Sequence, residues 1–176
     1  MTESPNRQFL ELYEPLHSSF TRYCRAISGN NADAEDLVQD TIFTILTGLD
    51  KIRDLSLFKS YLFSVAGNLH RMRSRKKRFN GEINVQELMS LQDLKQNPEV
   101  QTDFRIMYDR MLKLPSKTSE ALILFHISDL SLQDIQNIQG GSLSAVKQRL
   151  KRGRERLLQQ LSEPSQVNAA ILFLNL

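Results

Sequence analysis

The sequence predicts an all-α protein of two small helical domains joined by a polar linker, and three observations support this prediction. Apolar residues recur at the three- and four-residue spacing of amphipathic helices, and no run shows sustained strand-like alternation. A polar, weakly periodic stretch that contains Pro98 interrupts the pattern. Two capped helices joined by Gly140 and Gly141 are expected further on. The predicted division is residues 1–79, the linker 80–101, residues 102–161 and an apolar tail, residues 162–176.

Composition limits the classes of function that the chain can have. Its 176 residues are 40% hydrophobic and 24% charged, which suits a folded core and excludes wholesale disorder. The single cysteine, Cys24, excludes internal disulfides and cysteine-rich metal sites, and it is expected to pack as a small core residue. No apolar run is long enough to span a bilayer and no signal peptide is present, so a cytoplasmic location without a membrane partner is expected.

Catalytic patterns are missing from the sequence. No carboxylate cluster stands beside a histidine, no cysteine–histidine pair occurs, and no glycine-rich phosphate loop is present. The three histidines are not at metal-ligand spacing. The chain is therefore predicted not to be an enzyme and to use no cofactor. With a net charge of +3, the basic clusters are more informative than the total charge.

The first half of the chain predicts three helices. Residues 7–28 form the first, which Pro15 must kink or restart, and Ser28 to Asn31 form a stop and a cap. In the next helix, 32–49, the apolar residues are expected on one side: Ala34, Val38, Ile42, Ile45 and Leu49. Asp33, Asp36, Gln39 and Asp40 lie roughly opposite. These acids suit a solvated face near a helix N-terminus, or alternatively a docking face for a basic partner.

A loop at residues 51–57 precedes the third helix, which is predicted over residues 57–78 with Asp54 or Ser56 as its cap. Its apolar stripe is Phe58, Leu62, Val65, Leu69 and Met72, and Phe63 and Arg71 are expected on the outward side. The basic run at residues 71–78 suits a solvated helix end. With an exposed aromatic ring upstream, it also suits binding of single-stranded nucleic acid.

The second half predicts further helices. One short helix near residues 85–91 is expected within the linker, and helices are expected over about 102–114 and 117–128. The tail after Pro164 is too short to span a membrane. It is interpreted as a last helix packed on the second domain, and a partner-binding or dimerising segment is the alternative.

Residues 131–161 have the pattern of a helix-turn-helix. Ser131 and Asp134 can form a capping box, and Ser142 can cap the second helix. The second helix has an apolar stripe at Leu143, Val146, Leu150, Leu157 and Leu161. Its other faces carry Lys147, Arg149, Lys151, Arg152, Arg154 and Arg156. Such a basic helix suits the DNA major groove, although an ordinary helical hairpin with a solvated basic face would give a similar charge run.

Two blocks, residues 9–79 and 104–161, together resemble the extracytoplasmic-function group of bacterial RNA polymerase sigma factors. The first block contains AEDLVQD at 34–40 and FKSYLFSVAGNL at 58–69, followed by the basic run. The second contains Leu114-Pro115, then DI at 134–135, then SLSAVKQRLKRGRERL at 142–157. The resemblance implies a subunit that binds core RNA polymerase and directs it to promoters. The alternative is a helix-turn-helix regulator that binds duplex DNA without entering polymerase.

The resemblance also implies partners and site residues. Core polymerase would bind Asp33, Glu35, Asp36, Gln39 and Asp40. The melted −10 element would bind Lys51, Arg53, Asp54, Ser56, Phe63, Asn68, Arg71 and Arg75. The duplex −35 element would bind Ser142, Ser144, Ala145, Lys147, Gln148, Arg149, Lys151 and Arg152. An anti-sigma factor is a further candidate partner in this group.

Four residues depart from the pattern of the group. Tyr61 replaces a usual tryptophan, Gln136 a usual alanine, Gln139 a usual leucine and Gly141 a usual aliphatic residue. A glutamine buried without hydrogen-bond partners is costly. The first helix of the helix-turn-helix is therefore expected to be looser, or packed differently, than is usual in the group.

Overall fold

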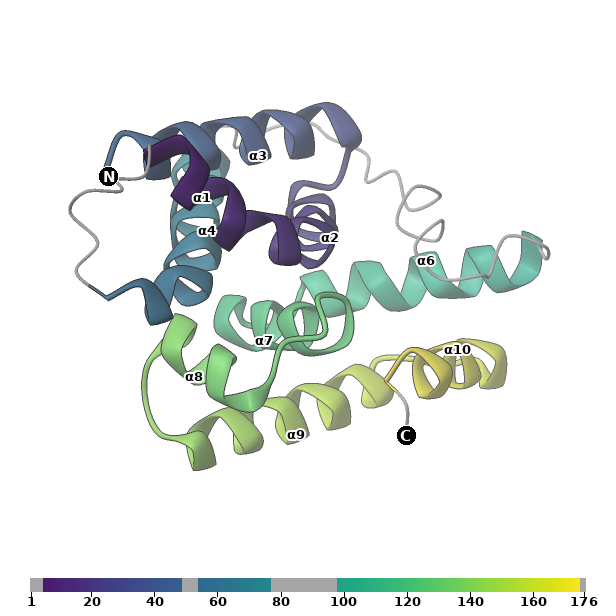
Figure 1. Ribbon diagram of the computed structural model, residues 1–176. Coiled ribbons are helices and arrows are strands. Elements are labelled where there is room, and N and C mark those ends of the chain that lie inside the picture. The colour runs from purple at the N-terminus through teal and green to yellow at the C-terminus, as the bar shows by residue number, and fades with distance from the viewer. Residues whose placement is uncertain (1–4, 49–53, 77–97, 175–176) are drawn as a thin grey trace. The chain divides into compact units, whose positions relative to one another are not determined.

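A computed structural model describes residues 5–48, 54–76 and 98–174, and every regular element within these ranges is a helix (Figure 1). The chain divides into two compact units, Met1–Ile83 and Asn84–Leu176. The predicted all-α fold with two helical domains is thus confirmed. The short helix expected near residues 85–91 and most of the predicted linker lie outside the described residues.

The first unit contains six helical segments among its described residues, and local signals explain where they begin and end. They are α1 (Pro5–Tyr13), η1 (Glu14–Leu16), α2 (His17–Ser28), α3 (Asn31–Leu46), η3 (Leu55–Leu57) and α4 (Phe58–Lys76). Pro15 interrupts the first helix as a 3-10 turn, as predicted. Gly29 ends α2 with a φ of 79°, and the Asn30 side chain caps α3 by accepting a hydrogen bond from the Asp33 N–H at 2.8 Å.

An aromatic cluster forms the core of the first unit. The Phe63 ring on α4 packs edge-on against Phe20 and tilted against Tyr23, with centroid distances of 5.5 and 5.2 Å. All three side chains are fully buried. Cys24, which follows Tyr23 in α2, is also fully buried, and this burial raises the pKa of its thiol, as expected for an inert core residue.

The burial of Phe63 corrects the predicted orientation of α4. The buried residues of this helix include Phe58, Leu62, Phe63 and Ala66, whereas Met72, predicted to be apolar core, is 58% exposed. A wide apolar face with two adjacent residues buried each turn accommodates the large Phe63 ring better than the narrow predicted stripe. Met72 lies in the last turns of the helix.

The buried side of α3 also differs from the predicted stripe. Ala34 and Ile45 are buried as predicted, but Val38 and Ile42 are only half-buried, and Leu49 lies outside the described residues. Leu37 and Thr41 complete the buried side. The Thr41 hydroxyl donates to the Leu37 carbonyl at 2.7 Å, so this polar group is buried without losing its hydrogen bond.

The second unit contains α6 (Pro98–Leu112), α7 (Ser116–His126), α8 (Leu132–Gln139), α9 (Leu143–Gln159) and α10 (Pro164–Leu174). Helix α6 begins four residues before the predicted start at Thr102. The apolar tail forms α10, which packs on α6 through an edge-to-face contact of Phe173 and Phe104 at 5.6 Å. None of the described helices is long and apolar enough to cross a bilayer.

Candidate nucleic-acid interface

Helices α8 and α9 form the predicted helix-turn-helix, and side-chain caps fix its geometry. The Ser131 hydroxyl accepts from the Asp134 N–H at 3.1 Å, and the Ser131 N–H donates to the Asp134 carboxylate at 3.1 Å. This reciprocal pair is the predicted capping box. Gly140 and Gly141 have φ values of 74° and 92°, a backbone conformation that favours glycine.

Helix α9 has one buried and one basic exposed side. Val146, Leu150, Gly153 and Leu157 are buried against the rest of the unit. Most of the residues predicted to read the −35 element are exposed: Ser142, Ser144, Lys147, Gln148, Lys151 and Arg152. The Ser142 hydroxyl caps α9 by accepting from the Ala145 N–H at 3.1 Å. Ala145 and Arg149 are half-buried at the edge between the two sides.

The departing glutamines of α8 have hydrogen-bond partners, contrary to the concern that they would be buried without them. Gln136 donates from its amide to the Gly141 carbonyl at 3.0 Å, across the turn. Gln139 donates to the Lys117 carbonyl at 3.0 Å and accepts from the Arg149 guanidinium at 2.6 Å. The first helix of the motif therefore packs through polar contacts where apolar residues are usual.

The acidic side of α3 exposes four of the five residues predicted to bind polymerase: Glu35, Asp36, Gln39 and Asp40. The fifth, Asp33, is half-buried, and its carboxylate accepts from the Asn30 side chain at 2.9 Å. Asp33 therefore takes part in capping the N-terminus of α3 through its contacts with Asn30. Its N–H and its carboxylate both bind Asn30, which leaves it less available to a partner than the exposed acids.

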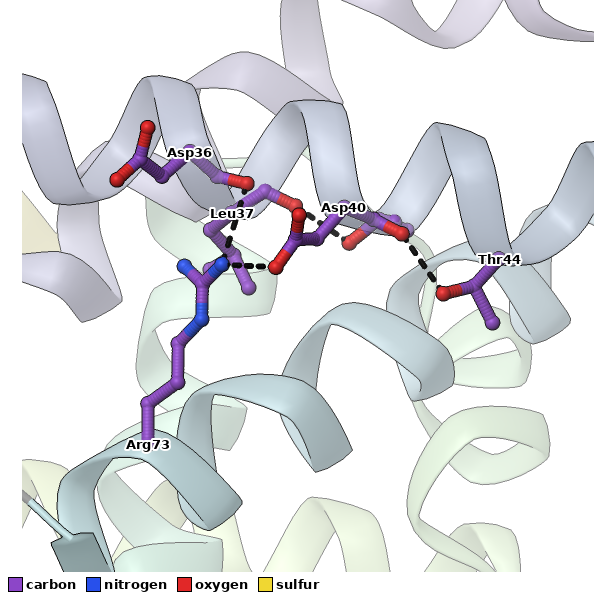
Figure 2. A network of polar contacts seen from close by, with 6 residues as sticks. Asp36, Leu37, Asp40, Thr44 and Arg73 are labelled. Carbon is purple, nitrogen blue, oxygen red and sulfur yellow. Dashed lines mark hydrogen bonds and ion pairs between the residues drawn. The ribbon is translucent and has the colours of Figure 1, made fainter.

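Arg73 of α4 crosses to the acidic side of α3 (Figure 2). Its guanidinium forms an ion pair with the Asp40 carboxylate and donates to the Asp36 carbonyl at 3.4 Å. Figure 2 shows the Asp36 carboxylate directed away from Arg73, while the Asp40 backbone carbonyl accepts from the Thr44 hydroxyl at 2.7 Å. Among the acids of α3, Asp40 is therefore engaged within the unit, and Asp36 presents its carboxylate to solvent.

The residues predicted to bind the −10 element are only partly within the described chain. Lys51 and Arg53 lie outside it, as does the side chain of Arg75. Asp54 caps η3 by accepting from the Ser56 N–H at 2.9 Å and from the Ser56 hydroxyl at 2.6 Å. These hydrogen bonds lower the pKa of Asp54. The Asp54 carboxylate therefore caps η3, the short helix that leads into α4.

The prediction that Phe63 stacks on bases is wrong, because its ring is fully buried in the core of the first unit. Tyr61, which is 38% exposed, is the exposed aromatic residue among those of α4, since Phe58 and Phe63 are both buried. It lies two turns before Asn68, on the same side of the helix. Asn68 is exposed and accepts from the Arg71 guanidinium at 2.7 Å. The sequence did contain a signal for Tyr61, because this residue stands where a tryptophan is usual in related proteins.

Comparisons with known proteins match both units. Residues 12–79 match the family model for sigma-70 region 2, and residues 104–157 match the model for sigma-70 region 4. The ECF RNA polymerase sigma factor EcfG of Rhodopseudomonas palustris is 31% identical over 141 residues, which cover 79% of this chain and 77% of that protein. SigW of Bacillus subtilis, also an ECF sigma factor, is 26% identical over 168 residues, 88% of this chain and 89% of SigW.

Two solved structures share the fold. The sigma factor RpoE of Bartonella quintana, in complex with the anti-sigma factor NepR, has a TM-score of 0.59 and 26% identity. The match covers 87% of this chain and 94% of RpoE. CnrH in complex with the cytosolic domain of CnrY has a TM-score of 0.64 and 24% identity, covering 86% of each chain.

Within the described residues, no cluster of three or more histidine, cysteine, aspartate or glutamate side chains could hold a metal ion.

Proposed function

Because this chain belongs to the extracytoplasmic-function RNA polymerase sigma factors, we propose a division of its promoter recognition between the two units. The first unit docks on core polymerase through α3 and holds the opened −10 strand along α4. The second unit binds the −35 duplex through α9. The protein acts in the cytoplasm and is not itself a catalyst. By analogy with the RpoE–NepR complex, an anti-sigma factor is a partner in regulation.

The observation that carries the −35 assignment is the exposed side of α9. Lys151 and Arg152 are exposed there and provide positive charge for DNA phosphates. Ser144, Lys147 and Gln148 are exposed on the same side and can form hydrogen bonds at base edges. Because the buried residues Val146 and Leu150 fix the opposite side, this surface remains available to duplex DNA.

For the −10 strand, we propose Tyr61, Asn68 and Arg71 of α4 as the contacts. An exposed ring can stack on an unpaired base, and a guanidinium can bind the adjacent phosphate. The Asn68–Arg71 hydrogen bond supports a fixed orientation for that guanidinium. Lys51, Arg53, Ser56 and Arg75 remain proposed contacts from the resemblance alone. Asp54 is assigned a structural role as the cap of η3.

A selection experiment tests the proposed function. The full chain is mixed with core RNA polymerase, and a random-sequence duplex pool is selected for binding and transcription. We expect a two-block motif with separate −35 and −10 elements, and transcripts only when both the chain and polymerase are present. A chain that selects a duplex motif alone, without associating with polymerase, would instead be a helix-turn-helix regulator.

Substitutions on α9 separate base reading from phosphate binding. Arg152→Ala should weaken binding to all duplexes about equally and lower the salt slope by roughly one unit. Gln148→Ala or Lys147→Ala should instead change which −35 block is selected. An unchanged −35 block in both of the latter variants would show that another surface reads the bases.

A further inference from the structure

Gln139, at the C-terminal end of α8, is a polar residue at a position where leucine is usual in the group. Leucine there would contribute apolar packing between the helices of the motif. The glutamine amide instead offers two N–H donors and a carbonyl acceptor. The contacts of this amide indicate what it does.

The Gln139 amide joins three helices. Its nitrogen donates to the Lys117 carbonyl of α7 at 3.0 Å and to the Glu120 carboxylate of α7 at 2.9 Å. Its oxygen accepts from the Arg149 Nη1 of α9 at 2.6 Å. Both donor directions and the acceptor are therefore occupied, so the orientation of the amide is fixed. The bond from Arg149 is charge-assisted, because its donor is a guanidinium cation.

Arg149 lies at the border of the DNA-binding side of α9. It is half-buried, one residue before the buried Leu150 and one residue after the exposed Gln148. Within the described residues, the hydrogen-bond partner that the structure gives its guanidinium is Gln139. Because a guanidinium carries several N–H donors in a rigid fork, this bond restrains its orientation and leaves other donors for a phosphate.

We propose that Gln139 is a positioning residue for −35 binding, which holds the Arg149 guanidinium ready to contact a DNA phosphate. The proposal rests on the proposed function of α9. A phosphate is the expected target because Arg149 lies at the edge of the exposed side and not at its centre, where Gln148 lies. Holding the guanidinium in place before binding removes an ordering cost that DNA would otherwise have to offset.

The test is a double-mutant cycle of Gln139→Leu and Arg149→Ala in the full chain. Binding to a short random-sequence duplex is measured by fluorescence anisotropy over a range of salt concentrations. Arg149→Ala should weaken binding and lower the salt slope by roughly one unit. Gln139→Leu should weaken binding about threefold to tenfold through the lost ordering of Arg149. In the Arg149→Ala background, Gln139→Leu should have no further effect.

The same substitution at an exposed position of α8 serves as the matched control. The Gln133 side chain donates to Gln136 and Asn137 on its own helix, at 3.1 and 3.3 Å. Gln133→Leu should bind duplex like the wild type, whereas Gln139→Leu should not. Thermal melts of each variant identify any that fail to fold. Normal melting with weakened binding separates positioning from a purely structural role.

The outcomes distinguish this proposal from the proposed function. If Gln139→Leu weakens duplex binding equally in the wild-type and Arg149→Ala backgrounds, the positioning role is overturned. It is also overturned if Gln139→Leu leaves duplex binding of the otherwise wild-type protein unchanged. Tighter binding by Gln139→Leu would show that Gln139 withholds Arg149 from DNA. If Arg152→Ala and Arg149→Ala both leave duplex binding unchanged, α9 is not the DNA-binding helix, and the proposed function of the second unit fails as well.

Discussion

Gly153 shows how a single residue sets the distance between two helices of the second unit. A Cβ added at this position would lie 2.8 Å from Thr118 Cγ2 and 3.2 Å from Leu122 Cδ1, both on α7. The threonine side chain is stiff at χ1 and cannot easily move away. Glycine is therefore needed at this close approach of α9 to α7, despite its poor helix propensity.

Gly153→Ala is expected to destabilise the second unit. Alanine would gain about 1 kcal/mol in helix propensity, but overpacking a core costs about 1–3 kcal/mol, so the net loss should be near 1 kcal/mol. Chemical unfolding of the wild type and the variant measures the difference. Adding Thr118→Ser, which removes the clashing methyl group, should restore most of the loss. A stabilised Gly153→Ala protein would show that α7 and α9 can separate freely.

His126 makes the stability of the second unit depend on pH. Its Nε2 lies 3.3 Å from Arg154 Nε and Nη2, and the Arg154 guanidinium also lies 5.6 Å from the centre of the Phe125 ring. Burial, and secondarily the charge of Arg154, lowers the pKa of His126 to about 4. The imidazole is therefore neutral in the folded protein at neutral pH and accepts a hydrogen bond from Arg154.

The pH dependence follows from the sign of this shift. Between an unfolded pKa of about 6.5 and the folded pKa of about 4, the unfolded chain binds the proton more readily, so stability falls as pH falls. Allowing for partial exposure, the loss between about pH 7.5 and about pH 5 should be roughly 1–2 kcal/mol. His126→Gln, which keeps an acceptor for Arg154, should reduce this dependence. Identical pH profiles for the two proteins would contradict the assignment.

At the scale of whole elements, the acidic side of α3 distinguishes a polymerase-docking helix from a merely solvated one. Asp36→Arg reverses an exposed charge whose carboxylate points to solvent, so the stability change should be within about half a kcal/mol. Close charge pairs at interfaces couple by a few kcal/mol, so core polymerase should bind the variant about ten- to a hundredfold more weakly. A titration of core polymerase, with a melting curve beside it, measures both effects.

One control variant and one stability comparison sharpen this experiment. The control, Glu14→Arg, makes the same charge reversal at an exposed position of η1, outside α3, and should leave polymerase binding unchanged. The comparison, Asp40→Asn, removes the ion pair with Arg73, and because that pair is partly exposed the stability cost should be below about 1 kcal/mol. Equal losses of polymerase binding in Asp36→Arg and Glu14→Arg would indicate a general charge effect and not docking by α3.

The elements that sequence predicted best are those fixed by local chemistry. Gly29, Asn30 and Ser131 act within a few residues of themselves, so their stop and cap signals are visible in the sequence. Phe63 was misplaced because which side of α4 is buried depends on Phe20 and Tyr23, more than thirty residues away in the sequence. Its position beside the apolar stripe carried no local sign of this.

The same distinction explains the candidate site. Helical periodicity predicted that basic residues such as Lys147, Lys151 and Arg152 lie off the apolar stripe of α9, whereas their assignment to the −35 element came from the resemblance. The partners of Asp40 and Gln139 were not predictable, because Arg73 and Lys117 come from other helices, 33 and 22 residues away. Side-chain pairs between different helices can be predicted only when the packing of those helices is known, and no local sequence pattern shows that packing.

For the whole molecule, the division into Met1–Ile83 and Asn84–Leu176 predicts that the two activities can be separated. Each unit has a buried core of its own, around Phe20 and Phe63 in the first and Met107 and Leu122 in the second. We therefore expect residues 1–83 and 84–176 to fold as separate helical fragments, although domains this small are marginally stable. Circular dichroism of the two fragments should sum to that of the full chain.

The fragments should also divide the binding activities. Residues 1–83 should bind core polymerase with the same sensitivity to Asp36→Arg as the full chain, because α3 is complete in this fragment. Residues 84–176 should bind duplex DNA with the same salt slope as the full chain, because α9 and its support from α7 and α8 are retained. Limited proteolysis of the full chain should cut first within the polar stretch before α6, residues 80–97, and release two fragments close to these. First cleavage within α3 or α9 would contradict the two-unit organisation, as would duplex binding that requires residues 1–83.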